Sequence, residues 1–210
     1  IAFLRFGFPF PLALAAAVAM GALLGFLIGI PTLRLRRDYF LLVTFGFGEM
    51  IRAALLYLSQ LTGGAMGMAG MPRKVGLPLI LVSIAVITFI TYSLKRSRFG
   101  RKCVAIRDDE LAASIMGVNV YAQKILVFVI SSAITAYGGA LYAFNILFIE
   151  PNLFNWLESA KLIIITFVGG LNSIAGVIAA SAIYYSFGEF FRFIDVWRDV
   201  LLAVVVVLVI

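Results

Sequence analysis

The chain has no histidine and a single cysteine, and only 13% of its 210 residues are charged. The absence of histidine excludes imidazole metal ligands and removes the commonest general base. The lone Cys103 excludes a disulfide within this chain. The apolar stretches also lack a carboxylate pair, a Ser/Lys dyad or a metal-ligand cluster. We therefore predict no catalytic residue, no metal site and no enzymatic activity.

Apolar residues, by contrast, are abundant. Hydrophobic residues make up 63% of the chain and its mean hydropathy is +1.10, whereas about a quarter of the residues of a soluble domain are charged. Runs of about 20 apolar residues match the hydrocarbon core of a bilayer. The composition predicts an all-α, polytopic helical membrane protein. We assign the net charge of +7 to orientation and contact with membrane lipid, not to nucleic acid, because basic residues flank the apolar runs.

The apolar pattern predicts about five membrane spans and one broken or re-entrant segment. The four clear spans cover residues 12–30, 39–58, 77–94 and 125–148. A further apolar run at 200–210 is the start of a fifth. We expect residues 1–210 to form a single transmembrane domain that is truncated at both ends.

Three glycines recur at every fourth position of the first predicted span, at Gly21, Gly25 and Gly29. They leave one helix face without side chains, and in lipid such a stripe lets another helix approach closely. The stripe predicts a helix–helix contact, which is either static packing or a contact that moves.

The distribution of basic residues predicts the orientation. Residues 31–38 and 95–124 together hold ten of the 17 Lys and Arg residues, whereas residues 59–76 hold two. Short cytoplasmic loops are enriched in Lys and Arg. We therefore place 31–38 and 95–124 in the cytoplasm and 59–76 on the outer side.

Two charged residues, Glu49 and Arg52, lie inside the second predicted span and share one helix face. Charges at this depth normally face a bundle interior or water. They form either a structural ion pair or a polar station for a zwitterionic ligand. The glycine-rich loop that follows is either a surface turn or part of an outer mouth. Its candidate path residues are Thr62, Gly63, Gly64 and Gly67.

The segment after residue 160 is interrupted. Residues 161–168 and 177–187 are apolar, and each half is too short to cross a bilayer. The glycine-containing stretch 169–176 between them either unwinds at membrane depth and lines a path or forms a loop at the membrane surface. The candidate path residues of this break are Gly169, Gly170, Asn172 and Ser173.

The basic loop 95–124 contains one predicted short helix over residues 108–117. Asp108 or Asp109 can cap its first amides, and Glu110 adds a favourable charge at the positive helix end. Gly117 stands at the position where a left-handed residue closes a helix. Two helical turns are rarely stable alone in water, so either a partner protein or lipid headgroups would hold this helix.

These motifs resemble those of a transporter family. Residues 110–117, after Arg-Phe-Gly-Arg at 98–101, are similar to the ATPase-contacting loop of bacterial ABC importer permeases, in a loose form. Five ordered motifs resemble the branched-chain amino-acid permeases of the LivM type: Pro-Thr-Leu-Arg at 31–34, Phe-Gly-Glu-Met-Ile-Arg at 47–52, Leu-Thr-Gly-Gly at 61–64, Gly-Ala-Leu-Tyr-Ala at 139–143 and Gly-Gly-Leu-Asn-Ser-Ile-Ala-Gly at 169–176.

The resemblance implies a permease subunit of an ABC importer in a prokaryotic cytoplasmic membrane, which carries branched-chain or other small amino acids. Its implied partners are a second related permease, two cytoplasmic ATPases and an extracytoplasmic substrate-binding protein. ATP and Mg would bind to the ATPases, and this chain would bind no cofactor. A push on the short helix would tilt the third and fourth spans. The implied coupling residues are Asp108, Asp109, Glu110, Leu111, Ala112, Ala113 and Gly117.

Two alternatives stay open at this point. An ion-coupled secondary transporter would use the broken segment and the charges within the spans without any ATPase. The second alternative is a permease of the same family that carries urea or amides. The glycine-rich loop is followed by Met71-Pro72, without the Lys-Ser/Thr of a phosphate-binding P-loop, so ATP hydrolysis is not encoded in this chain.

Overall fold

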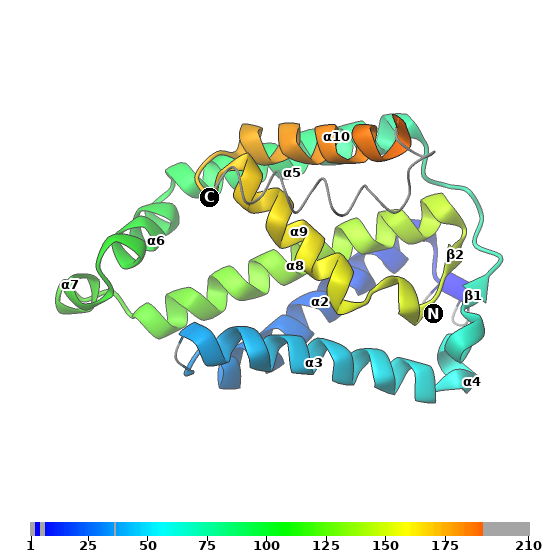
Figure 1. The fold of residues 1–210 in the computed structure, drawn as a ribbon, viewed down its shortest axis with the longest axis horizontal. Coiled ribbons are helices and arrows are strands. Elements are labelled where there is room, and N and C mark those ends of the chain that lie inside the picture. The colour runs from blue at the N-terminus through cyan, green and yellow to red at the C-terminus, as the bar shows by residue number, and fades with distance from the viewer. Residues whose placement is uncertain (1–2, 5–6, 36, 191–210) are drawn as a thin grey trace. The chain divides into compact units, whose positions relative to one another are not determined.

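The structure, a computed structural model, describes residues 3–4, 7–35 and 37–190, which are mostly helical (Figure 1). It divides into two compact units, Ile1–Phe154 and Asn155–Ile210, which we describe separately. The helices of the first unit are α2 (Phe10–Thr32), α3 (Arg37–Tyr57), α4 (Ser59–Thr62), α5 (Leu77–Arg96), α6 (Arg98–Asp108), α7 (Glu110–Ile115) and α8 (Val120–Ile146). Its short elements are η1 (Gly64–Met66), β1 (Met68–Ala69), β2 (Phe148–Ile149) and η2 (Pro151–Leu153). The second unit holds α9 (Trp156–Gly169) and α10 (Ile174–Phe190).

Four helices among the described residues are long and apolar enough to cross a membrane: α2, α3 from Tyr39 onward, α5 and α8. They coincide with the four clear spans of the sequence, so the all-α, polytopic prediction is confirmed. Their surfaces expose large apolar side chains, such as Leu42 and Phe89, because lipid takes the place of water around them. The run at 200–210 lies outside the described residues, and the prediction of one domain over 1–210 stays a prediction.

Among the differences from the predictions, two helix boundaries and the content of the basic loop have local reasons. Helix α2 continues to Thr32, with Pro31 in its last turn, because the amide of Leu33 still bonds to the Gly29 carbonyl at 3.1 Å. Helix α8 begins at Val120 and not at 125, because the side chain of Asn119 caps it. The basic loop holds two helices and not one, since α6 precedes α7.

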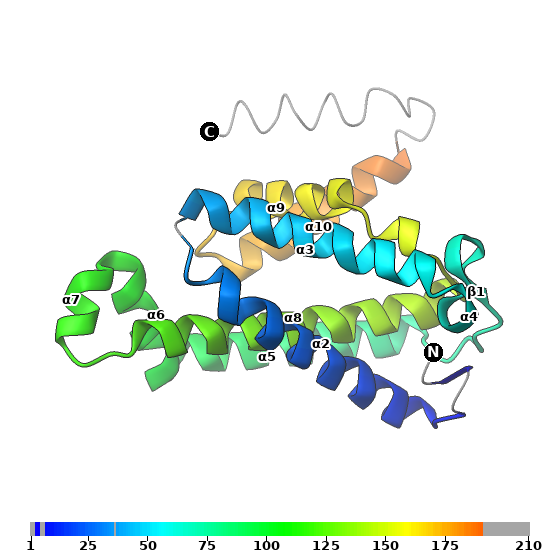
Figure 2. The same cartoon turned by 90° about the horizontal axis from the view of Figure 1, so that it is seen from below.

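The predicted glycine stripe of α2 packs against α8, and Figure 2 shows these two helices side by side. A Cβ atom added at Gly21 would collide with the side chain of Ala136. One added at Gly25 would lie 2.5 Å from the Ser132 hydroxyl oxygen, and one at Gly29 would lie 3.1 Å from a neighbouring aromatic ring. The predicted helix–helix contact is therefore confirmed, and it is closest at Gly21 and Gly25.

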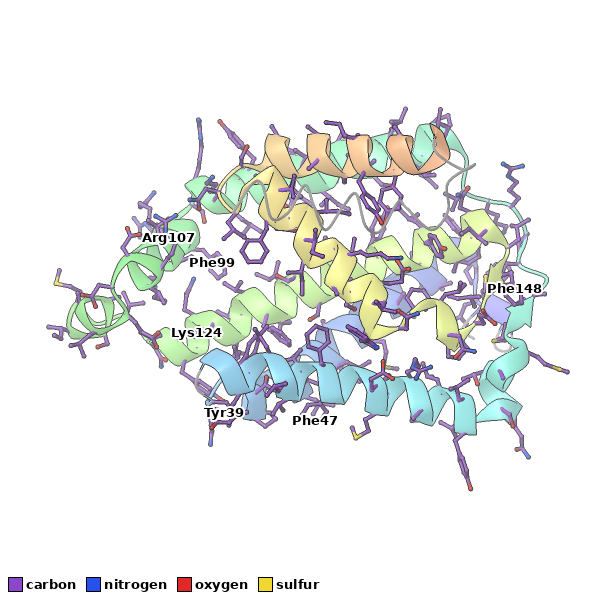
Figure 3. All side chains as sticks on the ribbon, viewed as in Figure 1. Tyr39, Phe47, Phe99, Arg107, Lys124 and Phe148 are labelled. Atoms are coloured by element: carbon purple, nitrogen blue, oxygen red, sulfur yellow. The ribbon has the colours of Figure 1, made fainter. Side chains whose placement is uncertain are left out.

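Two sets of contacts define the two ends of the first unit. At one end, the guanidinium of Arg34 donates to the Tyr121 hydroxyl at 3.2 Å, so the loop after α2 lies beside the start of α8. At the other end, β1 and β2 pair in antiparallel register, with Met68 opposite Ile149. The loop after α3 thus meets the end of α8. Figure 3 shows Lys124 and Phe148 at these opposite ends. The basic loops share one end, as the orientation prediction requires.

Candidate functional site

The N-terminus of α7 settles which aspartate caps this helix. One carboxylate oxygen of Asp109 accepts hydrogen bonds from the amides of Leu111 at 2.8 Å and Ala112 at 3.0 Å. Asp108 instead ends α6 and pairs with Arg107 at 2.8 Å. The cap gives α7 six residues, fewer than the eight or so expected, because the chain is extended at Asp109.

The C-terminus of α7 closes as the sequence predicts. The amide of Val118 donates to the Ala113 carbonyl at 3.1 Å and the amide of Gly117 donates to the Ser114 carbonyl at 3.0 Å. This bond pair defines a Schellman motif, which needs a left-handed residue. Gly117 supplies it with a φ of 82°. The direction of the chain between α7 and α8 is therefore set by one glycine.

Both α6 and α7 are bonded to the start of α8. The ammonium of Lys124 donates to both carboxylate oxygens of Glu110 at 2.7 Å, which links α7 to α8. The buried amide of Gln123 donates to the Phe99 carbonyl at 3.2 Å and to the sulfur of Cys103 at 3.2 Å, which links α6 to α8. Sequence reasoning missed Gln123 and Lys124, since no local spacing connects them to their partners.

Apolar side chains of α7 face solvent. Leu111 is 72% exposed, Ile115 is 77% exposed and Met116 is 84% exposed, while Ala113 is buried. Figure 1 shows α6 and α7 projecting beyond the end of α8. The earlier choice between a protein partner and lipid headgroups concerns this surface. Clustered exposed apolar residues mark contacts with either a protein or a membrane, so both alternatives stay open.

The predicted mouth residues at the other end form a tight, ordered turn. The hydroxyl of Thr62 lies 2.6 Å from the Leu55 carbonyl and accepts the amide of Gly64 at 3.1 Å. Gly63 and Gly67 have φ values of 76° and 69°. A Cβ atom at Gly67 would lie 2.6 Å from the Ile149 carbonyl oxygen. These glycines therefore hold the loop closely against β2.

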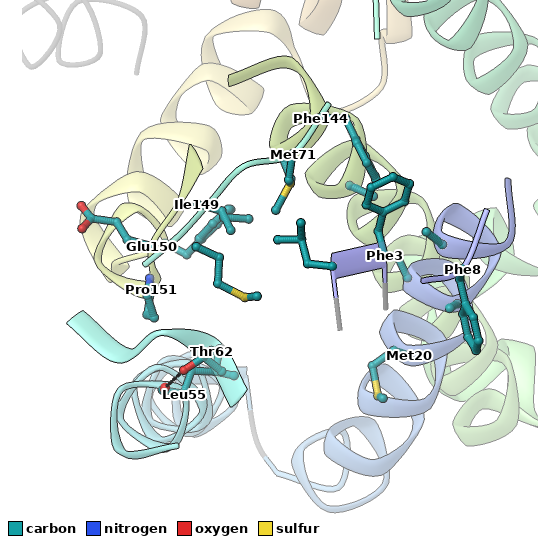
Figure 4. Close-up of a pocket in the computed structure, with 18 residues that line it drawn as sticks. Phe3, Phe8, Met20, Leu55, Thr62, Met71, Phe144, Ile149, Glu150 and Pro151 are labelled. Atoms are coloured by element: carbon teal, nitrogen blue, oxygen red, sulfur yellow. Dashed lines mark hydrogen bonds between the residues drawn. The ribbon is translucent and has the colours of Figure 1, made fainter. Parts of the chain in front are cut away.

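A cavity of about 600 Å³ lies beside this turn (Figure 4). Its walls come from the first half of α2, the end of α3, the end of α8 and the segments around β1 and η2. Thr62 is the one predicted path residue that lines it. Glu150 also contributes, and Figure 4 shows its carboxylate pointing away from Met71 and Phe144. Apart from Thr62 and Glu150, the lining consists of apolar residues.

Glu49 and Arg52 of α3 form an ion pair. The guanidinium of Arg52 donates to Glu49 at 2.8 Å and to the side-chain carbonyl of Asn152 at 3.1 Å. Neither charged residue lines the cavity. The contacts match the structural ion pair, and the polar station stays a hypothesis.

The predicted break at 169–176 contains a turn over residues 170–173 between α9 and α10, two helices that pack together within the second unit. The amide of Ser173 donates to the Gly170 carbonyl at 3.1 Å, and the Ser173 hydroxyl accepts the amide of Gly176 at 3.0 Å. A Cβ atom at Gly169 would lie 2.6 Å from the Val177 backbone. The predicted interruption is confirmed. The roles of Gly169, Gly170, Asn172 and Ser173 in a path stay predictions.

Comparison with known proteins decides the family. The sequence profile of the permease component of branched-chain amino acid transport systems matches residues 1–210. The chain belongs to this family. It is therefore a multi-pass protein of the plasma membrane, from a family of transport subunits, as its sequence motifs indicated.

The relatives show the breadth of the family. The chain is 31% identical to the high-affinity branched-chain amino acid permease protein LivM of Escherichia coli, over 89% of this chain and 52% of the relative. It is 27% identical to the fructose import permease protein FrcC of Rhizobium meliloti, over 85% and 55%. It is 27% identical to an autoinducer 2 import permease, LsrC, of Escherichia coli, over 82% and 52%. The chain spans about half the length of these relatives. No solved structure matches it.

Proposed function

We propose that this chain is the membrane-spanning permease subunit of an ABC importer for branched-chain or other small amino acids. The observation that carries the proposal is α7, a capped helix that exposes Leu111, Ile115 and Met116 and is bonded to α8. This arrangement supports docking of an ATPase at α7. The implied assembly adds a second permease, two ATPases that hold ATP and Mg, and an extracytoplasmic binding protein. Relatives named for branched-chain amino acids support the substrate.

The contacts of α7 suggest how ATP-driven motion would spread. A push on α7 reaches α8 through the bond between Glu110 and Lys124. Helix α8 is in turn packed against the glycine stripe of α2, and Tyr121 donates to the Ile30 carbonyl at 2.8 Å. We therefore propose that α2 and α8 move together. The sequence instead pairs the third and fourth spans, α5 and α8, which share a hydrogen bond between the hydroxyls of Ser83 and Tyr137, and that pairing stays a prediction.

Co-purification tests the assembly. The full-length chain would be purified by affinity in detergent and its partners identified by mass spectrometry. We expect two ATPase chains with the wild type and their loss from a variant with 108–117 replaced by a Gly/Ser linker. A triple serine variant at Leu111, Ile115 and Met116 should give the same loss. Met66→Ser is the matched control, because Met66 is 88% exposed at the opposite end. A wild-type chain that purifies without ATPases would contradict the proposal and favour an ion-coupled transporter.

Charge reversal tests the link between α7 and α8. Exposed ion pairs contribute at most about 1 kcal/mol to stability, so the readout is substrate-stimulated ATPase activity in the assembled complex. Glu110→Lys and Lys124→Glu should each lower the stimulation several-fold, and the double swap should restore most of it. Equal losses in the single and double variants would show that the pair does not transmit the motion.

A further inference from the structure

We infer that the cavity at the end of the first unit receives the apolar side chain of the transported amino acid, and that Ala16 and Ala17 limit the size it accepts. The inference rests on the proposed function, because it assigns a site to the substrate of that importer. It is carried by the shape, the chemistry and the position of the cavity.

The shape comes from alanines on two adjacent helices. Ala13, Ala16 and Ala17 face the cavity from α2, and Ala140 and Ala143 face it from α8. Their spacings of three and four residues place each set on one helix face. Small side chains on both helices leave space that larger residues would fill. The resulting volume, about 600 Å³, lies within the range of small-molecule sites.

The chemistry of the lining selects an apolar ligand. Met20, Leu55, Met71 and Phe144 supply much of the wall. The hydroxyl of Thr62 is already bonded to the Leu55 carbonyl and to the Gly64 amide. The carboxylate of Glu150 points away from the wall residues Met71 and Phe144 (Figure 4). Burying the ammonium or the carboxylate of an amino acid here would be unfavourable, so only its apolar side chain would enter the cavity and both charged groups would stay outside. A sugar carries hydroxyl groups on all sides and would leave some of them inside without partners.

The position suits substrate that arrives from outside. The cavity adjoins the loop that the basic-residue pattern places on the outer side, at the opposite end from α7. Part of the lining belongs to α2 and α8, the pair proposed to move. The rest comes from α3, α4, β2, η2, the segment around β1, and Phe3, Leu4 and Phe8. A shift of α2 and α8 would therefore change the width of the cavity.

Selective uptake tests the inference. The full-length chain, assembled with its co-purified subunits in proteoliposomes containing ATP, would be given radiolabelled alanine, valine or leucine. Ala17→Leu extends a side chain into the cavity and narrows it beside α2, so we expect the ratio of leucine to alanine uptake to fall several-fold. Ala15→Leu adds the same group on an exposed face of α2 outside the lining, and it should keep the ratio within about twofold. Met20→Ala enlarges the cavity and should raise uptake of phenylalanine relative to leucine, which keeps the test available if Ala17→Leu does not assemble.

Each outcome has a distinct meaning. Lowered leucine-to-alanine ratios in Ala17→Leu but not in Ala15→Leu support the inference. Unchanged ratios in Ala17→Leu and Met20→Ala complexes that still transport overturn it while leaving the proposed function intact. Unchanged ratios with loss of co-purified phospholipid in Ala17→Leu would overturn it in favour of an acyl chain as the occupant. Absence of ATP-driven amino-acid uptake by the wild type overturns the proposed function itself.

Discussion

Helices α2 and α3 follow each other in the chain and both contain glycines, yet their surroundings differ. The glycines of α2 at 21, 25 and 29 meet α8 closely, whereas a Cβ atom at Gly46 or Gly48 of α3 would have no described atom within 4 Å. Residues four apart share a helix face, while residues two apart do not. Spacing, and not glycine content, therefore marks the contact face of a membrane helix.

The two helices are also held differently. Helix α2 packs along α8, while α3 is fastened near its ends. Phe40 stacks edge-on against Phe128 of α8 with ring centroids 6.2 Å apart, and Arg52 bonds to Asn152. The membrane-spanning window of α3 has no buried residue within the described structure. Its exposed faces are left for lipid or a neighbouring subunit, so changes on α3 should cost less stability than changes on α2.

The largest expected effect is at the α2–α8 interface. Gly21→Leu places a side chain against Ala136 and the backbone of Ser132, so we expect a loss of about 1–3 kcal/mol or more in stability, typical of overpacking. Gly48→Leu is the matched control and should change stability little. Thermal unfolding of the full-length protein in detergent, followed by size-exclusion chromatography, measures both. Equal stability of the two variants would show that α2 and α3 do not differ in how closely their glycines are packed.

Coupling should depend on the closing turn of α7. Gly117→Pro or Ala113→Trp should abolish substrate-stimulated ATPase activity while the chain still inserts, because the first cannot adopt the positive φ of Gly117 and the second enlarges a buried alanine. Gly46→Val on α3 is the control, because a Cβ atom at Gly46 would have no described atom within 4 Å. It should leave the stimulated ATPase activity unchanged. Normal stimulation in the α7 variants would contradict the role of this helix in coupling.

A smaller effect should follow from the bond that ties the ends of α2 and α8. Tyr121→Phe removes the hydroxyl that donates to the Ile30 carbonyl and accepts from Arg34. The expected loss is about 1 kcal/mol, the usual contribution of a hydrogen bond, measured by the same unfolding assay. Tyr57→Phe on α3, where the side chain is 91% exposed, should leave stability unchanged. An equal loss of stability in Tyr57→Phe would show that the hydrogen bond to Ile30 does not account for the effect of Tyr121→Phe.

The smallest effect is expected from the ion pair of α3. Exchanging Glu49 and Arg52 keeps both charges on the same face, so a structural pair should retain transport and substrate preference, with a stability change within about 1 kcal/mol. Uptake of labelled amino acids by the swapped variant is the measurement. Loss of amino-acid uptake in a stable, assembled swap would instead support the polar station at these residues.

Local signals predicted much of this architecture. Apolar length identified the four spans, the four-residue spacing identified the contact face of α2, and the Asp-Glu start with Gly117 identified the ends of α7. Each signal acts within a few turns of helix. The partner of the glycine stripe was not predictable, because Ser132 and Ala136 lie about a hundred residues away in the sequence. Serine and alanine occur in several other spans as well, so the residue types alone do not identify the partner helix.

The cavity and the α6 helix were missed for different reasons. The alanines at 13, 16 and 17 share one face of α2, and this spacing is the signal that could have indicated the cavity wall. The cavity itself was not predictable, because the space between helices depends on how the helices pack. The sequence predicts a loop where α6 forms, because charged residues dominate the composition of this segment. The hydroxyl of Ser97 accepts a hydrogen bond from the amide of Gly100 at 3.3 Å and so caps the start of α6. A serine before the helix is a signal that the sequence itself contains.

The pairing of α2 with α8 has a consequence for biosynthesis. Tyr121 and its acceptor Ile30 are 91 residues apart, and two spans are made between them. At synthesis rates of about 5–20 residues per second, the newly inserted α2 waits roughly 5–20 s before α8 emerges from the ribosome. During that interval its glycine stripe has no native partner. The contact between α2 and α8 therefore forms only after α3 and α5 have been made, so it depends on the stripe staying available to a span that arrives late.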